Sequence, residues 1–310
     1  MNKFIVTTTI NPPTEALEKY IKFQETKGWK LIVVGDLKTP HDKHRSGLYQ
    51  YMTPADQAEA YGELSDVIGW NSISRRSIGI VEAYKQGADV IATVDDDNIP
   101  YDDWSDDLYV GQTVEIDLFK RDLHVFDPLS VTHNSHLWHR GYPIEYLNQR
   151  HDGSFVGTEK RYVKVQADLW NGDPDIDAIC RITFSPEVWF NVDKPYGARD
   201  AFSPFNSQNT FLSREVIPDY MLFPRTGRMD DIWASYVLES RHPNSVIYNR
   251  ASVFQKRNPH DLTVDLENEM LGYKYSKKLL DRLYSGNDYR DLLPEPTKKF
   301  EAAYRRALGV

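Results

Sequence analysis

The stretch Val90-Ile91-Ala92-Thr93-Val94-Asp95-Asp96-Asp97 decides the fold of this chain. Its first five residues are small or β-branched and predict a buried strand. Three carboxylates then emerge where that strand ends, at the edge where doubly wound sheets receive ligands. Adjacent carboxylates repel one another unless a cation offsets the repulsion, and Mg²⁺ or Mn²⁺ prefers such hard oxygen ligands and also bridges a diphosphate. The alternative is an acidic turn, because Asp97-Asn98-Ile99-Pro100 consists of ordinary turn residues.

The segments that precede this stretch alternate between strand and helix signals. We expect strands over Phe4–Thr9 and Leu31–Val34, and helices over Thr14–Thr26 and Ser72–Gln86. Such alternation is typical of a parallel sheet with crossover helices. The sequence therefore predicts an α/β fold.

The remaining two thirds of the chain give weaker signals. Residues 100–200 are rich in aromatic residues and prolines and show no clean periodicity, which is typical of a loop-rich region that covers a substrate. From about residue 260 the sequence is charged and its leucines recur at helical spacings. We expect a C-terminal helical appendage there, which either packs on the core or forms an oligomer contact.

Composition and charge exclude several classes of function. The chain has 310 residues, of which 40% are hydrophobic, enough for a sizeable core. A net charge of −9 argues against nucleic acid or an anionic membrane surface as the main partner. The sequence holds no run of about 18 apolar residues and no signal peptide, so we expect no membrane span and a cytoplasmic location. One cysteine, Cys180, excludes an internal disulfide.

Polar residues at the ends of the first two expected strands are candidates for nucleotide binding. Thr8 and Asp36 lie where a doubly wound sheet usually receives a nucleotide, and an aspartate there can accept from a ribose hydroxyl or a base N–H. Arg75 and Arg76, near the start of the following helix, would reach phosphate oxygens. The alternatives are a strand-favouring threonine, a turn-capping aspartate and solvated arginines. The chain lacks a Gly-x-Gly-x-x-Gly motif and a Walker-type loop.

A second group of candidates lies in the C-terminal half. Asp230 and Asp231 precede an expected helix, where they either cap it or hold and deprotonate a sugar hydroxyl. Trp233 beside them would stack on a sugar face or join the core. Amide side chains that both donate and accept suit a polyhydroxylated ligand, although they suit ordinary loop hydrogen bonding equally well. The segment 204–210 supplies three of them: Asn206, Gln208 and Asn209.

Several motifs in one order carry a family resemblance. They are Asp95-Asp96-Asp97, Arg140-Gly141-Tyr142-Pro143, the stretch 171–178, the stretch 204–210 and Asp230-Asp231-Ile232-Trp233. This order resembles the STELLO-type glycosyltransferase-like proteins and, more distantly, the reversibly glycosylated polypeptides, which are UDP-arabinopyranose mutases. The resemblance covers residues 4–255. It implies a GT-A-like nucleotide-diphospho-sugar transferase fold, with a mixed, mostly parallel sheet flanked by helices.

The resemblance also implies ligands and roles. It implies a nucleotide-sugar donor, with a UDP-sugar favoured, and Mn²⁺ or Mg²⁺ held by Asp95 and Asp97. Asp95 and Asp96 would also contact the nucleotide part of the donor, while Arg140 and the Asp230-Asp231 pair would face the sugar.

Two places depart from the family patterns. In the mutases an arginine shortly after the Arg-Gly-Tyr-Pro run becomes glycosylated; Arg150 follows that run in this chain, but residues 144–149 differ from the mutase pattern. Many GT-A enzymes supply a late histidine to the metal, whereas this chain reads Val253-Phe254-Gln255 there, with His260 the nearest histidine.

Three functions follow as hypotheses. The first is a metal-dependent glycosyltransferase that moves a sugar from a nucleoside diphosphate to a carbohydrate-type acceptor, with Asp230 or Asp231 as the base if configuration inverts. The second is a nucleotide-sugar mutase, and the third is a non-catalytic scaffold that retains the fold. In each case we expect a nucleotide-sugar-binding domain over residues 1–258, and a helical extension over 259–310 through which homo-oligomers would form.

Overall fold

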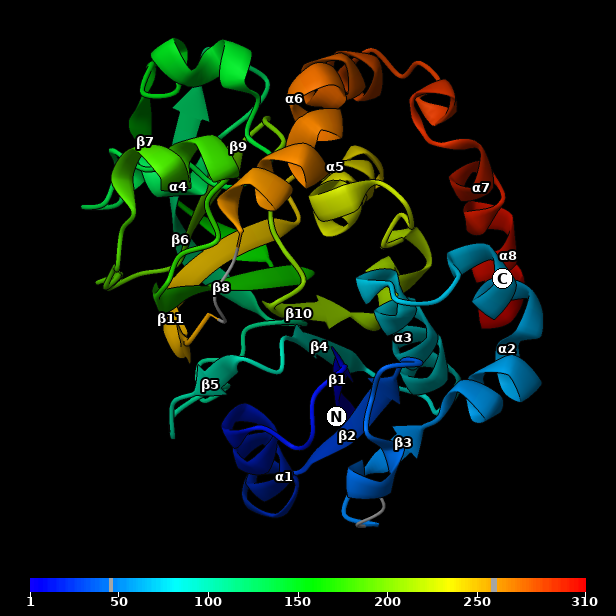
Figure 1. Ribbon diagram of the computed structural model, residues 1–310. Helices are drawn as coiled ribbons and strands as arrows, with labels where there is room; N and C mark the ends of the chain where they lie inside the picture. The colour runs from blue at the N-terminus through cyan, green and yellow to red at the C-terminus, as the bar shows by residue number, and fades with distance from the viewer. Residues whose placement is uncertain (45–46, 258–260) are drawn as a thin grey trace.

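The computed structural model describes residues 1–44, 47–257 and 261–310, and its centre is a single twisted sheet flanked by helices (Figure 1). The strand order is β3-β2-β1-β4-β10-β8-β11-β9-β6-β7, and β5 pairs with β11 at the side of this path. The strands are β1 (Lys3–Thr9), β2 (Trp29–Gly35), β3 (Gln50–Met52), β4 (Val90–Val94), β5 (Asn98–Pro100), β6 (Thr113–Arg121), β7 (Gly153–Tyr162), β8 (Val165–Gly172), β9 (Tyr196–Arg199), β10 (Asn209–Ser213) and β11 (Val246–Gln255).

Helices cover both faces of the sheet (Figure 1). They are α1 (Glu15–Lys27), α2 (Pro54–Ile68), α3 (Arg76–Lys85), α4 (Ala178–Phe184), α5 (Asp230–Arg241), α6 (Leu262–Tyr284), α7 (Glu295–Lys298) and α8 (Phe300–Leu308). Short 3₁₀ turns precede two of them, η2 (Ile73–Arg75) before α3 and η6 (Gly227–Met229) before α5.

The directions of the strands place the acidic triplet at the edge of the sheet where β1, β2 and β4 end. β1 pairs in parallel with β2 and with β4, so the carboxyl ends of these strands lie together. From β3 to β11 along the sheet, β10 runs against its two neighbours while β8 and β11 pair in parallel. The prediction of an α/β, GT-A-like fold with a mixed, mostly parallel sheet is therefore confirmed for this part of the sheet.

The two faces of β1 show why this sheet is stable. Phe4 and Val6 pack into the core on the side of α3, while Ile5 packs into the core on the side of α1. A strand covered by helices on both faces must be apolar throughout, which explains the unbroken hydrophobic runs of the sequence. Gly79 lets α3 approach closely, because a Cβ there would lie 2.6 Å from Val6 Cγ1.

The expectation of a loop-rich region over 100–200 is wrong for much of its length. β6 and β7 pair antiparallel across the long connection 122–152, and β8 follows β7 closely. Burial does not follow the sequence pattern in these strands: β7 is mostly exposed, while all eight residues of β8 are buried, although polar and apolar residues alternate over 165–169. α2 and β3 were not expected from the sequence.

The expected C-terminal helices are present and pack on the core. α6 contacts α4, α5 and η6, and α8 contacts α2 and α3. The proposed boundary after residue 258 falls within residues 258–260, outside the described residues, as does His260, so the division into domains stays a prediction. Among the described helices, none combines the length and the apolar character that crossing a membrane would need.

Candidate functional site

Two adjoining cavities open at the edge where β1, β2 and β4 end, with volumes of about 270 and 230 Å³. We call the first the strand-edge pocket; it is lined by Thr8, Thr9, Ile10, Asn11, Val34, Asp36, Lys38, Asn71, Ser72, Ile73, Arg75 and Asp96. We call the second the acidic cleft; it is lined by Ile73, Asp95, Asp97, Arg140, Asp175, Ser207, Gln208, Gly227, Arg228, Asp230, Asp231, Gln255 and Arg257. Ile73 lines both cavities, so they form neighbouring halves of one site.

The strand-edge pocket contains Thr8 and Asp36, as the sequence predicts. The Thr8 hydroxyl is buried and has no hydrogen-bond partner among the described residues. Asp36 accepts from the backbone N–H groups of Asn71 and Ser72 at 2.9 and 3.0 Å, which fixes the loop before η2 against the end of β2. A buried hydroxyl without a partner carries a desolvation penalty that a polar ligand would relieve.

Arg75 does not take the phosphate-binding role expected of it. Its Nε donates to Gln57 at 2.7 Å, and its two terminal nitrogens donate to the Gly69 carbonyl and the Ser65 hydroxyl at 2.9 Å each. The guanidinium also stacks on Trp70. All three nitrogens already donate to the protein, so Arg75 supports the pocket from beneath.

Arg76 is fully buried and pairs with the first aspartate of the triplet. It forms an ion pair with Asp95 and donates to the carbonyl and hydroxyl oxygens of Ser207 at 2.7 and 2.6 Å. One oxygen of Asp95 is thereby neutralised by an arginine. Both terminal nitrogens of Arg76 donate to Asp95 or to the loop before β10, whereas its Nε is buried without a hydrogen-bond partner in the described chain. The guanidinium therefore stabilises the triplet from within the core.

The other two aspartates of the triplet differ from Asp95 and from each other. Asp96 accepts from the Thr9 hydroxyl and from Asn11 Nδ2, which ties it to the end of β1. Asp97 Oδ1 is buried and has no hydrogen-bond partner in the described chain. Burial, together with the charges of Asp95 and Asp96, raises the pKa of Asp97 to about 7. A cation bound beside Asp97 would favour its charged form and offset the repulsion within the triplet.

The triplet fits a divalent cation in one particular mode. Within residues 1–44, 47–257 and 261–310, no group of three or more histidine, cysteine, aspartate or glutamate side chains is arranged to hold a metal ion. Asp97 nevertheless offers an unpartnered carboxylate oxygen in the acidic cleft, and Asp95 lines the same cleft. Mg²⁺ typically binds through one or two carboxylates and completes its shell with phosphates and water. The residues fit such a shared site, in which Asp97 and Asp95 would hold the ion.

Arg140 crosses the acidic cleft and holds two carboxylates at once. Its Nε and one terminal nitrogen each donate to Asp175 at 2.8 Å, and its terminal nitrogens donate to Asp231 at 2.9 and 3.2 Å. Burial by itself would raise the pKa of Asp175, but the Arg140 guanidinium holds that pKa well below its usual range. Asp231 also accepts from the Ser207 backbone N–H at 2.8 Å, so both of its carboxylate oxygens already accept hydrogen bonds.

Asp230 is the less engaged member of its pair. Its carboxylate accepts from the Ser74 hydroxyl at a long 3.4 Å. Burial, followed by the charge of Asp231, raises the pKa of Asp230 to about 7. The alternative that the pair caps α5 is not supported, because in the described chain that helix has no side-chain cap and follows Met229. Asp230 is therefore a carboxylate with a pKa near neutrality in a cleft, which suits a general base.

Three of the predicted sugar-binding residues lie outside the cleft, and these predictions are wrong. Trp233 is fully buried and donates to Ser276 on α6 at 3.0 Å. Asn209 is fully buried and donates to Ser252 at 3.0 Å, within the core of the sheet. Arg150 is buried and pairs with Asp127 at 2.9 Å. Each of these side chains is buried and bonded to a partner inside the protein, so it does not reach the cleft.

The other two amide residues lie at the site. Gln208 lines the acidic cleft and donates to Gln255 at 3.0 Å. Asn206 donates to Asp175 at 2.9 Å and so contacts the cleft through that carboxylate. The prediction that this segment borders the site agrees with the geometry, although its polar groups mostly serve one another.

Sequence reasoning missed three charged residues of the cleft. Asp175 stood out only as one of several acids in 171–177, and neither Arg228 nor Arg257 was singled out. Arg228 donates to Glu269 on α6 at 2.7 Å, and Arg257 follows β11. Two signals could have found the arginines: Arg228 directly precedes Met229-Asp230-Asp231, and Arg257 follows the last strand of the core.

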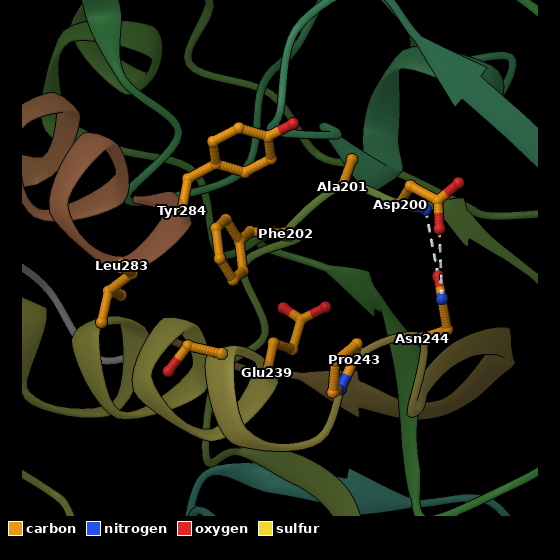
Figure 2. Close-up of a pocket in the computed structure, with 9 residues that line it drawn as sticks. Asp200, Ala201, Phe202, Glu239, Pro243, Asn244, Leu283 and Tyr284 are labelled. Carbon is orange, nitrogen blue, oxygen red and sulfur yellow. Dashed lines mark hydrogen bonds between the residues drawn. The ribbon is translucent and has the colours of Figure 1, made fainter. Parts of the chain in front are cut away.

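A further hollow lies away from these residues, beside the C-terminal ends of α5 and α6 (Figure 2). Figure 2 shows Asp200 hydrogen-bonded to Asn244 at one side and Glu239 between Phe202 and Pro243. Burial raises the pKa of Glu239 well above its usual range, and its carboxyl accepts from the Ser203 N–H at 2.8 Å. This hollow contains no part of the acidic triplet or the Asp230-Asp231 pair.

Fold and site together define a class: an α/β, GT-A-like chain with an acidic triplet between a polar pocket and a carboxylate-lined cleft. Over 243 residues, or 71% of its length, the chain is 26% identical to the probable glycosyltransferase STELLO2 of Arabidopsis thaliana and 25% identical to STELLO1 of the same plant. The chain is thus homologous to the STELLO proteins, as the motifs predict. It spans 31% and 30% of the length of these relatives.

Other comparisons are weaker. No family model matches the chain. Glucosyl-3-phosphoglycerate synthase from Mycobacterium tuberculosis superposes with a TM-score of 0.48 and 12% identity, over 93% of this chain and 81% of that one. A putative glucose-1-phosphate thymidylyltransferase from Bacillus anthracis gives 0.36 and 10%, over 84% and 98%. The more distant resemblance to the reversibly glycosylated polypeptides stays a prediction.

Proposed function

We propose that this chain binds a nucleoside diphosphate sugar across the two cavities and transfers the sugar to a carbohydrate-type acceptor, with Mn²⁺ or Mg²⁺ at the acidic triplet. One observation carries the proposal: two buried oxygens, Thr8 Oγ1 and Asp97 Oδ1, have no hydrogen-bond partner in the described chain, and their residues line adjoining cavities. The first suits a nucleoside and the second suits a cation with its diphosphate. The homology to STELLO proteins supports a sugar donor, and the resemblance favours UDP.

The side chains of the cleft then take separate roles. A bound divalent cation would act as a Lewis acid on the departing diphosphate. For an inverting transfer, the acceptor oxygen bonds to the anomeric carbon, the bond from that carbon to the diphosphate oxygen breaks with its electron pair, and Asp230 takes the acceptor proton. Arg140 holds Asp231 and Asp175 in one buried network, which fixes the wall of the cleft beside which the sugar would lie. For a retaining transfer, Asp230 positions the sugar.

The mutase alternative gains no support from the geometry. Its distinguishing residue would be an accessible arginine, and Arg150 is buried, with its NH1 donating to Asp127 and to the Leu137 carbonyl at 2.9 and 2.7 Å. A scaffold role does not explain why Asp97 keeps an unpartnered carboxylate oxygen beside two further aspartates. A cytoplasmic location and oligomers through the C-terminal helices stay predictions.

The test is a two-step screen. UDP-, GDP-, dTDP- and CDP-sugars are first compared for thermal stabilisation of the chain, with Mn²⁺ and with EDTA. A donor that stabilises only with Mn²⁺ is then incubated with and without carbohydrate acceptors, and the products are resolved. Transfer to an acceptor supports the proposal. Pyranose–furanose conversion without acceptor would support the mutase, and the absence of stabilisation by any donor would support the scaffold.

A further inference from the structure

We propose that Arg257 binds the donor diphosphate directly, so that the chain itself neutralises part of the charge assigned to the metal. This inference rests on the proposed function, because it names a residue that would contact the same donor. It begins with the register of the sheet. β11 pairs antiparallel with β5, with Gln255 opposite Asn98, and the Lys256 N–H donates to the Asp97 carbonyl at 3.2 Å. The chain after β11 therefore runs back along the acidic triplet, which brings Arg257 beside Asp97.

Arg257 is buried without adequate partners. Its side chain is 6% exposed, yet neither Nε nor one terminal nitrogen makes a hydrogen bond within the described part of the chain. A buried guanidinium that leaves donors unused pays a large desolvation penalty. The same guanidinium lines the acidic cleft and also a neighbouring cavity below the N-terminus of α1. Its free donors thus lie at the place where a ligand of the triplet would enter.

The nearest carboxylates do not satisfy this arginine. Asp173 and Asp175 lie 3.5 and 3.8 Å from it, at ion-pair distance but without a hydrogen bond. Asp173 is paired more closely with Arg181, and Asp175 is held by both Arg140 and Asn206. Because these carboxylates are committed elsewhere, Arg257 keeps donors for another anion.

A diphosphate fits this position for two reasons. Guanidinium donors match pairs of phosphate oxygens, and such charge-assisted bonds are short and strong. In addition, a cation held by two carboxylates would have its charge largely cancelled by them, so the diphosphate needs a further positive group. Arg76 is less suited to this role, because both of its terminal nitrogens already donate to Asp95 and Ser207 and it lines neither cavity.

The experiment measures UDP and UMP affinity by calorimetry, with Mn²⁺ and with EDTA, for wild type and two variants. Arg257→Gln removes the charge. Arg250→Gln is the matched control, because Arg250 lies on β11, the strand that precedes Arg257, but pairs with Asp103 and Asp107 away from the cleft. We expect Arg257→Gln to weaken UDP binding in Mn²⁺ about tenfold or more, with UMP binding unchanged. Arg250→Gln should change neither.

Equal UDP affinity in wild type and Arg257→Gln, or an equal loss for UMP and UDP, would overturn the inference while leaving the proposed function in place. Failure of the wild type to bind any nucleoside diphosphate in Mn²⁺ would instead overturn the proposed function. Should Arg257→Gln fail to fold, Arg257→Lys keeps the charge and loses the paired donors. We then expect a smaller loss of UDP affinity, with UMP affinity again unchanged. If Arg257→Lys binds UDP as tightly as wild type, or loses UMP affinity equally, the inference is contradicted.

Discussion

Asp230 is buried and makes one long hydrogen bond, and we predict that it is the proton acceptor of the reaction. Asp230→Asn removes the proton acceptor but keeps the shape of the side chain, so turnover should fall by about 10²–10⁴-fold with little change in nucleotide affinity. Because burial raises the pKa of Asp230 to about 7, the wild-type rate should decline as the pH falls below about 7. Steady-state kinetics across pH 5–9 test both points; near-normal turnover in the variant would show that Asp230 is structural.

The same substitution should stabilise the protein. The pKa of Asp230 is raised in the folded state, so the folded chain binds the proton more tightly than the unfolded chain, and stability is lost as the pH rises from about 4 to about 7. An asparagine at this position does not ionise, so the variant keeps its stability as the pH rises. We expect a higher Tm for Asp230→Asn at pH 8 and a smaller gain at pH 5. Asp231→Asn should lower the Tm instead, since it weakens the buried pair with Arg140. A lower Tm for Asp230→Asn at pH 8 would contradict the assigned pKa shift.

Sequence reasoning was most successful for residues whose position depends on strand ends. Thr8 lies near the end of β1, Asp36 and Asp97 come after β2 and β4, and all three line the cavities. It failed for Trp233 and Asn209, because the sequence does not show which side of a helix or strand faces the core. Trp233 and Asn209 donate to Ser276 and Ser252, hydrogen-bond partners that are distant in sequence and hold the two side chains in the core.

At the scale of elements, α6 supports the cleft through one buried carboxylate. Glu269 accepts from Arg228 Nε and from the Ala178 N–H, each at 2.7 Å, and so joins α6 to η6 and to α4. We expect Glu269→Ala to lower the free energy of unfolding by about 1–3 kcal/mol, because it leaves buried donors without an acceptor. Urea denaturation measures this. Glu267→Ala, at an exposed position of the same helix, is the control, and an equal loss there would contradict the role of Glu269.

Elements were predicted well where local pattern and tertiary role agreed. β1, α1, β2, α3 and β4 were all expected within a few residues. The pairing of β6 with β7 was missed because β7 is largely exposed and its partner lies about 40 residues away in the sequence, which leaves little local signal.

At the scale of the whole molecule, the C-terminal helices belong to the main core. Leu279 and Leu280 of α6 and Phe300 and Tyr304 of α8 are fully buried in the same cluster as β1 and α3. A chain truncated to residues 1–257 should therefore lack a cooperative thermal transition and aggregate, because large apolar surfaces become exposed. Calorimetry of the truncated and full chains tests this. A truncated chain that unfolds cooperatively would show that residues 259–310 are a separable extension.

The central claim is that the acidic triplet holds a cation that binds a donor diphosphate. The most direct measurement is calorimetric titration of a UDP-sugar in Mn²⁺ into wild type, Asp97→Asn and Asp102→Asn. The Asp102 side chain is fully exposed and supplies the control. We predict Mn²⁺-dependent binding that Asp102→Asn retains and Asp97→Asn loses by at least about 100-fold, because the variant removes the unpartnered carboxylate. Unchanged affinity in Asp97→Asn, in a folded protein that still requires Mn²⁺, would contradict the claim.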